Sequence, residues 1–152
     1  MDILLIEDEN DKINHIKSYI KSTFDNIFVD VAKSYTSGVA RIYTKTLDLI
    51  LLDMSLPLND INENNIEENE FETFGGIDIL DEMKRVNKKI KVVVITAFDI
   101  LGEDEKQINL SQLDEVMKQN YKDIYLGCIH YNSSAIEWKE YLYEYINKIK
   151  SL

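Results

Sequence analysis

The sequence predicts an α/β fold in which helices cover both faces of a parallel sheet. Three short runs are continuously apolar and consist of Ile, Leu and Val: 3–6, 49–52 and 92–95. An unbroken apolar run of this length is typical of a strand that is buried on both faces. Two weaker strands are predicted at 27–31 and 124–129. Together these runs indicate five strands joined by helices, a (βα)5 arrangement.

Helical patterns separate the predicted strands. Two of them carry apolar stripes at a spacing of three to four residues, as the buried face of a helix requires. The stripes are formed by Ile13, Ile16 and Ile20 in the first, and by Ile77, Leu80, Met83 and Lys84 in the second. A shorter helix is expected at 39–44 because of the position of this segment in the chain. Another is expected at 113–119, where Ser111 and Asp114 mark the start.

The last helix has the clearest pattern. Ser134 is the expected N-cap, and Glu137 stands three residues later, where a capping box requires it. The predicted buried stripe consists of Trp138, Leu142, Tyr145 and Ile149.

Length and charge narrow the classes of protein that fit. The 152 residues suit one globular domain, 1–152, and 28 acidic against 17 basic residues give a net charge of −11. Such a chain offers no cationic surface for the phosphates of DNA or RNA. The acidic N-terminus is unlike a signal peptide, and no apolar run reaches the ~18 residues of a membrane span. With a single cysteine, we expect a cytoplasmic protein whose partners are proteins or cations.

Two connections are longer than the two to six residues usual after a strand of an α/β fold. They run from about 58 to 74 and from about 98 to 110. The first holds six acidic residues and no Lys or Arg. We expect both to be mobile, solvated insertions. A lid or a docking segment for a partner is the alternative, because both leave the ligand-binding edge of the predicted sheet.

Polar side chains follow the three most apolar strands at the point where each ends. They are Glu7 and Asp8, Asp53, and Thr96. Because parallel strands bring their carboxyl ends to one edge, three carboxylates and a hydroxyl should meet there. Their mutual repulsion favours a hard divalent cation, and Mg²⁺ prefers such oxygen ligands. Asp53 is then a candidate nucleophile for a phosphoryl group, and Thr96 a hydrogen-bond donor to it.

These residues resemble a known family, the receiver domain of two-component response regulators. Four segments carry the resemblance: 3–9 (ILLIEDE), 48–57 (DLILLDMSLP), 75–80 (GGIDIL) and 93–98 (VVITAF). Their order and spacing agree with the family over essentially the whole chain. The resemblance implies a flavodoxin-like, doubly wound parallel sheet with the strand order 2-1-3-4-5.

The resemblance also implies roles for individual residues. Glu7 and Asp8 correspond to the metal-binding pair, Asp53 to the phosphorylated aspartate, Ser55 to the residue whose backbone carbonyl binds the metal, Thr96 to the switch hydroxyl, and Ala97 to its small neighbour. It implies Mg²⁺ as the cofactor and a sensor histidine kinase or phosphotransfer protein as the partner. A signalling module of this kind is not itself an enzyme.

The sequence departs from the family in the fifth strand. Receivers carry there a Lys-Pro pair, whose ammonium contacts the phosphoryl oxygens, whereas residues 123–131 (DIYLGCIHY) contain no lysine. Aligning Tyr125 with the family's switch aromatic places Cys128 at the lysine position. Counting back from the last helix places His130 or Tyr131 there instead. Lys106, in the second long loop, is a candidate substitute.

The missing lysine leaves three functions open. The leading one is a receiver that accepts phosphoryl on Asp53. The second is a pseudo-receiver, which has the same fold but acts through protein contacts at the last helix or the acidic loop. The last is a Mg²⁺-dependent phosphatase with a strand-end aspartate nucleophile, although Ser55 stands where such enzymes carry a second acid. The last helix has more aromatic side chains than one helix face can bury. We therefore expect Tyr141 and Tyr143 to form a surface for a dimer or an effector.

Overall fold

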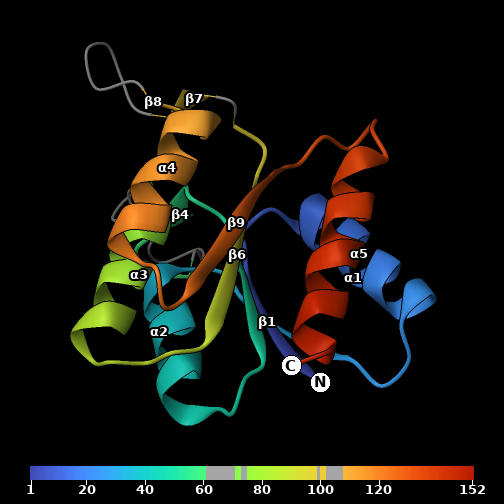
Figure 1. The fold of residues 1–152 in the computed structure, drawn as a ribbon, viewed down its shortest axis with the longest axis horizontal. Coiled ribbons are helices and arrows are strands. Elements are labelled where there is room, and N and C mark those ends of the chain that lie inside the picture. The colour runs from blue at the N-terminus through green and yellow to red at the C-terminus, as the bar shows by residue number, and fades with distance from the viewer. Residues whose placement is uncertain (61–70, 73–74, 99, 102–107) are drawn as a thin grey trace.

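The centre of the protein is a parallel sheet of five strands in the order β2-β1-β3-β6-β9. It is seen in a computed structural model, which describes residues 1–60, 71–72, 75–98, 100–101 and 108–152 (Figure 1). The strands of this sheet are β1 (Asp2–Ile6), β2 (Phe28–Ala32), β3 (Leu49–Leu52), β6 (Lys91–Thr96) and β9 (Tyr125–His130). Counted within this sheet alone, the order is 2-1-3-4-5, so the predicted fold is confirmed.

In the part of the chain that the structure describes, five helices cover the two faces of the sheet. They are α1 (Asn10–Thr23), α2 (Tyr35–Thr44), α3 (Gly75–Arg85), α4 (Leu110–Asn120) and α5 (Glu137–Lys150). Helices α1 and α5 lie on one face, and α2, α3 and α4 on the other (Figure 1). Leu5 and Leu51 pack with the first pair of helices, and Leu4 and Ile50 with the other three. Alternate residues of the central strands therefore enter two separate cores, which explains why the runs are apolar without interruption.

Two helices begin earlier than the sequence predicts, and both start with a capping box. Helix α2 begins at Tyr35, where the side chains of Ser34 and Ser37 each accept a hydrogen bond from the other's backbone N–H. Helix α4 begins at Leu110, where Asn109 and Gln112 make the same exchange. The predictions of helices at 39–44 and 113–119 therefore missed the first turn in each case.

The predicted start of the last helix is wrong. Ser134 does not cap α5: its backbone N–H donates to Oδ1 of Asn132, and the N-cap position belongs to Ile136, with no side-chain cap. The buried stripe also differs by one residue, because Ile146 is buried and Tyr145 is only partly covered.

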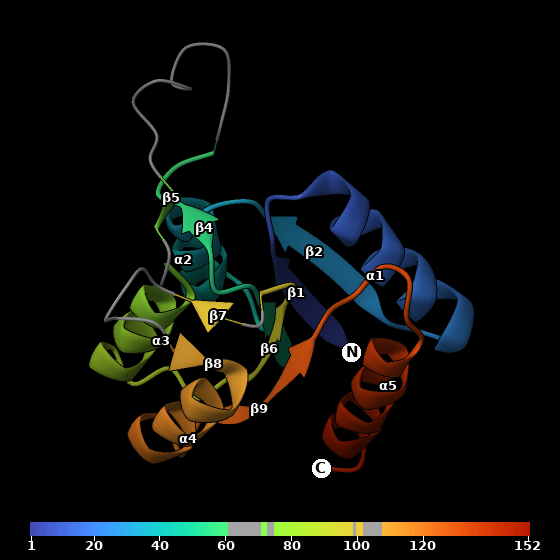
Figure 2. The ribbon, with the colours of Figure 1, turned by 90° about the horizontal axis from the view of Figure 1, so that it is seen from above.

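Two short antiparallel ladders stand at the carboxyl edge of the sheet (Figure 2). Strand β4 (Leu56–Pro57) pairs with β5 (Phe71–Glu72), and β7 (Ile100–Leu101) pairs with β8 (Ile108–Asn109). Strand β5 and the β7–β8 ladder fall within the predicted long loops, and β4 lies just before the first of them. The expected mobility of those loops, and Lys106 as a substitute cation, concern residues outside the described ones. Among the helices that the structure describes, none is long and apolar enough to cross a membrane.

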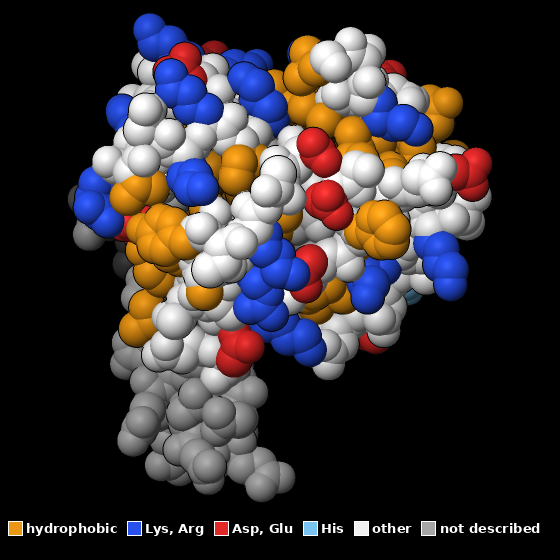
Figure 3. Space-filling view, turned by 90° about the horizontal axis from the view of Figure 1, so that it is seen from below, with side chains coloured by type: hydrophobic (Ala, Val, Ile, Leu, Met, Phe, Trp, Pro, Cys, Tyr) orange, Lys and Arg blue, Asp and Glu red, His pale blue; other side chains and the backbone are white. Residues whose placement is uncertain are grey.

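The edge of the molecule opposite the carboxyl ends of the strands carries mixed charges, among which Lys and Arg are prominent (Figure 3). Two of its lysines bind backbone carbonyls: Lys84 donates to Asn120 at the end of α4, and Lys91 donates to Asp123. Cations at a helix C-terminus are favourable for the helix dipole. These lysines therefore have a structural explanation.

Candidate functional site

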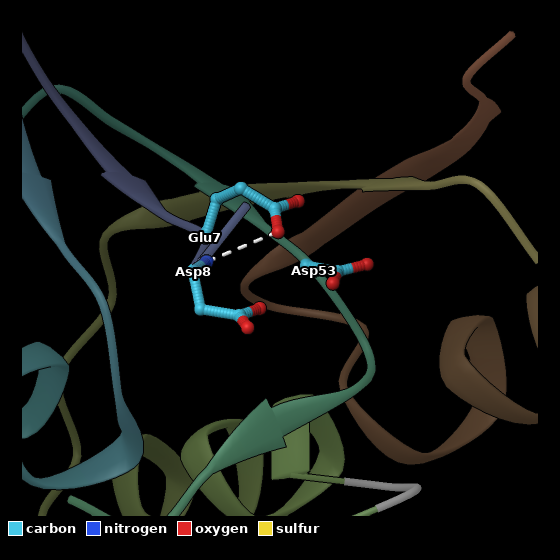
Figure 4. Close-up of side chains that lie close together, drawn as sticks. All are labelled: Glu7, Asp8 and Asp53. Carbon is cyan, nitrogen blue, oxygen red and sulfur yellow. Dashed lines mark hydrogen bonds between the residues drawn. The ribbon is translucent and has the colours of Figure 1, made fainter. Parts of the chain in front are cut away.

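Three carboxylates meet at the carboxyl edge of the sheet. Glu7 and Asp8 follow β1, Asp53 follows β3, and these strands are neighbours with Ile6 paired to Leu52. One oxygen from each carboxylate lies within 4.8 Å of the other two (Figure 4). The structure thus brings the three acids together as predicted.

The Glu7 carboxylate is held by backbone groups. Its Oε2 accepts hydrogen bonds from the N–H of Asp8 at 3.0 Å and the N–H of Glu9 at 3.1 Å, and Figure 4 marks the first of these. The side chain is 2% exposed. A buried carboxylate fixed in this way has its other oxygen, Oε1, aimed into the site.

A lysine that the sequence analysis did not identify completes the site. The ammonium of Lys12, on α1, lies 2.5 Å from Oε1 of Glu7 and 3.4 Å from Oδ1 of Asp53. It also donates a hydrogen bond of 2.8 Å to the backbone carbonyl of Ile95. Lys12 is 2% exposed. One signal in the sequence pointed to it, because Lys12 stands four residues before Ile16 on the buried stripe of α1.

Burial and charge raise the pKa of two of the carboxyls. The pKa of Asp53 rises from 3.8 to about 7, mainly because the group is buried, and the charge of Glu7 adds to the rise. The charge of Lys12 and a hydrogen bond from the Thr96 hydroxyl act in the opposite direction. Burial and the charge of Glu7 raise the pKa of Asp8 to about 6. Lys12 thus leaves part of the negative charge uncompensated, as expected of a site that accepts a further cation.

The remaining predicted residues lie around Asp53. Thr96 is fully buried at the end of β6, and its hydroxyl acts to lower the pKa of the Asp53 carboxyl. Ser55 is half-buried two residues after Asp53, and Ala97 is exposed next to Thr96. The roles predicted for Thr96, Ser55 and Ala97 stay predictions.

Strand β9 approaches the site without a lysine of its own. Its register pairs Cys128 with Val94, and His130 with Thr96. Cys128 is half-buried, and burial raises the pKa of its thiol to about 12. The charge of Asp114 adds to this rise of the pKa, and the charge of Lys12 opposes it.

The predicted switch aromatic, Tyr125, is buried at the start of β9. Its hydroxyl donates a hydrogen bond of 2.5 Å to Oδ1 of Asp114 on α4. Burial and this hydrogen bond raise the pKa of the phenol. The side chain is therefore fixed between the sheet and α4.

Comparison with known proteins agrees with this geometry. No family model matches the sequence. The receiver domain of the Francisella response regulator 1452 has a TM-score of 0.64 and 18% identity, with 97% of this chain and 94% of that chain covered. The chain has the fold of a response regulator receiver domain. A second structure with this fold is response regulator TrrA from Thermotoga maritima in complex with Mg²⁺-BeF, with a TM-score of 0.59 and 15% identity over 94% of this chain and 96% of that chain.

Two curated relatives match the receiver-like chain over nearly their whole lengths. The Detocs response regulatory protein DtcB of Enterobacter cloacae is 22% identical over 98% of this chain and all of that protein. The uncharacterized protein y4jR of Sinorhizobium fredii is 27% identical over 91% of this chain and 92% of that protein. Both relatives therefore have about the length of this chain.

Proposed function

We propose that the protein is the receiver module of a two-component phosphorelay and accepts a phosphoryl group on Asp53 in the presence of Mg²⁺. The observation that carries the proposal is the convergence of Glu7, Asp8 and Asp53 within 4.8 Å at the carboxyl edge of the sheet. The name of the relative DtcB and the Mg²⁺-BeF complex of TrrA support it.

The reaction is a single group transfer. A carboxylate oxygen of Asp53 attacks the phosphorus of the donor, and the bond from phosphorus to the donor breaks. The donor leaves with the electron pair, and an acyl phosphate forms on Asp53. Thr96, whose hydroxyl already acts on the pKa of this carboxyl, is the nearby hydroxyl that can bind a phosphoryl oxygen.

The residues present fit a hard divalent cation. Asp8 and Asp53 offer carboxylate oxygens, and the resemblance adds the backbone carbonyl of Ser55. Glu7 supplies charge beside them while its own oxygens bind N–H groups and Lys12. Bound Mg²⁺ would neutralise charge on the transferred phosphoryl group.

We infer that the phosphoryl donor is a sensor histidine kinase or a phosphotransfer protein, and that the chain acts in the cytoplasm without enzymatic turnover of its own. For the output, α5 offers two exposed aromatic side chains, Tyr141 at 55% and Tyr143 at 48%. Large exposed aromatics are favoured in protein interfaces. We therefore place a dimer or effector contact at this helix.

The test is to incubate the protein with Mg²⁺ and acetyl phosphate and to measure its intact mass. We expect the mass of one added phosphoryl group, lost in Asp53→Asn and in the presence of a chelator. Asp48→Asn is the matched control, because Asp48 lies at the opposite end of β3 and bonds the N–H of Asp2. An unmodified wild type, or equal modification of Asp53→Asn, would contradict the proposal.

A specific observation favours a second candidate, the pseudo-receiver. The ion pair between Lys12 and Asp53 already partly neutralises the acceptor, and β9 brings no lysine. Such a chain would signal through protein contacts alone. The same experiment separates the two functions, because a pseudo-receiver gains no mass. The phosphatase alternative still lacks a second acid, since Ser55 stands at the required position.

A further inference from the structure

Lys12 has a buried ammonium to which the proposed function gives no role. A lysine that is 2% exposed loses nearly all of its hydration, which is unfavourable unless good partners compensate. The position is unfavourable in a second way, because Lys12 is in the first turn of α1, where the helix dipole disfavours positive charge. A site that holds a cation under these conditions is specifically arranged for it.

The direction of the side chain explains how it reaches the site. Side chains of a helix lean toward its N-terminus, and α1 begins three residues after Glu7. Lys12 therefore points back over the carboxyl edge of the sheet, where its ammonium contacts three strand ends. These contacts are with Glu7 after β1, Asp53 after β3 and the Ile95 carbonyl in β6.

The surroundings on the β9 side are compatible with this position. Cys128, at one candidate position for the family's lysine, is a small uncharged side chain on the strand that pairs with β6, and β6 carries the Ile95 carbonyl that the ammonium binds. The ammonium also lies 5.4 Å from the ring centroid of Tyr131, just beyond the end of β9. Lys12 thus reaches from α1 to the side of the acids where β6 and the end of β9 lie, and β9 supplies no lysine of its own there.

We propose that Lys12 of α1 is the cation that binds a phosphoryl group on Asp53, in place of the lysine that β9 lacks. This inference rests on the proposed function. An ammonium 3.4 Å from Oδ1 of the acceptor is near enough to contact an oxygen of a phosphoryl group attached there. The fixed Glu7 acts as a positioning residue, because it holds the ammonium at 2.5 Å while its own Oε2 is held by backbone N–H groups.

The test compares Lys12→Met, which keeps the length of the side chain and removes its charge, with Lys17→Met, which changes an exposed lysine of the same helix. The first measurement is the initial rate of Asp53 modification by acetyl phosphate at saturating Mg²⁺. We expect a loss of at least about tenfold in Lys12→Met and none in Lys17→Met. A folded Lys12→Met protein that reacts at the wild-type rate overturns the proposal.

A second measurement guards against a merely structural effect of Lys12. Removing a positive charge beside the carboxylates should tighten binding of Mg²⁺, measured alone by titration, while it slows phosphorylation. Lower Mg²⁺ affinity together with slower modification would indicate a collapsed site and would contradict the assignment. If Lys12→Met does not fold, the double variant Glu7→Gln/Lys12→Met removes both charges of the buried pair and serves instead, with the same expected loss.

Relocating the charge gives the sharpest test. In Lys12→Met/Cys128→Lys the ammonium would enter the same space from β9, and we expect it to restore part of the lost rate. No restoration in a folded double variant counts against a shared position. A further measurement is the stabilisation of the protein by beryllofluoride and Mg²⁺. It distinguishes a failure of the proposed receiver function from a failure of the role proposed for Lys12. A wild type that neither reacts nor is stabilised refutes the receiver function itself, whereas equal behaviour of wild type and Lys12→Met refutes only the role of Lys12.

Discussion

Gly76 packs directly against the backbone of Asp53, so that a β-carbon at position 76 would lie 2.5 Å from the Asp53 carbonyl oxygen. The N–H of Gly76 also donates to the carbonyl of Met54 at 2.9 Å. The first turn of α3 is thereby fixed to the loop that carries the proposed phosphoacceptor. Only glycine permits this approach without moving the loop.

We therefore expect Gly76→Ala to destabilise the protein by about 1–3 kcal/mol and to weaken Mg²⁺ binding, because the new methyl group must displace the backbone at Asp53. Denaturant unfolding and Mg²⁺ titration measure the two effects. Gly38→Ala is the control: its β-carbon would meet the side-chain end of Ile6 at 3.0 Å and no backbone atom of the loop that carries Asp53, so Mg²⁺ affinity should not change. Equal Mg²⁺ affinity of Gly76→Ala and wild type would show that the contact does not position the site.

A second prediction concerns the cation. Mg²⁺ at millimolar concentration should raise the melting temperature, since it binds the folded site and relieves repulsion among the carboxylates. Asp8→Asn should reduce this gain and should stabilise the metal-free protein. Asp8 is chosen for this variant because a substitution of Glu7 or Asp53 would also remove an ion pair with Lys12. A wild type whose melting is unaffected by Mg²⁺ would mean that the predicted metal site is wrong.

The third prediction is a pH dependence in the metal-free protein. The pKa of Asp53 is about 7 in the folded state against 3.8 without the fold. A carboxyl with a raised pKa contributes stability that is complete below the unfolded value and is lost as the pH rises through the folded one. Asp53→Asn removes this loss, so its stability relative to wild type should increase between pH 4 and pH 8, by an amount on the order of a few kcal/mol.

The measurement is the free energy of unfolding of both proteins in chelator across this pH range. Because only the difference between the two counts, other titrating groups cancel to first order. A difference that stays constant with pH would contradict the buried, charged environment assigned to Asp53.

The fold was predictable because its signals are redundant. Each central strand is buried on both faces, so every residue of 49–52 had to be apolar, and no local alternative fits that pattern. Helix starts were harder, since the Ser34–Ser37 and Asn109–Gln112 caps combine residue types that are also common in loops. At Ser134 the same ambiguity produced a wrong cap, because a capping pattern does not say whether the backbone turns into a helix there.

The candidate site was predictable in its acids and not in its cation. Glu7, Asp8 and Asp53 follow apolar strands directly, so the topology alone brings them together. Lys12 comes from a helix, and a lysine next to Asp11 at a helix start is usually solvated. Its one signal, the place four residues before Ile16, does not show that the ammonium reaches the acids, because that depends on the distance from α1 to the sheet edge.

The last prediction concerns β9 and the helix that covers it. A β-carbon on Gly127 would overlap the hydroxyl end of Tyr145 on α5, so this glycine leaves room for that hydroxyl against β9. Gly127→Ala should cost about 1–3 kcal/mol in unfolding free energy, because the ring must move away. Tyr145→Ala removes the side chain that the new methyl group would meet. In the Tyr145→Ala background, Gly127→Ala should therefore lower the unfolding free energy much less. A double-mutant cycle measures this coupling, which we expect to exceed about 1 kcal/mol. Additive effects of the two substitutions would show that Tyr145 is free to move, and that Gly127 is required by the backbone of β9 instead.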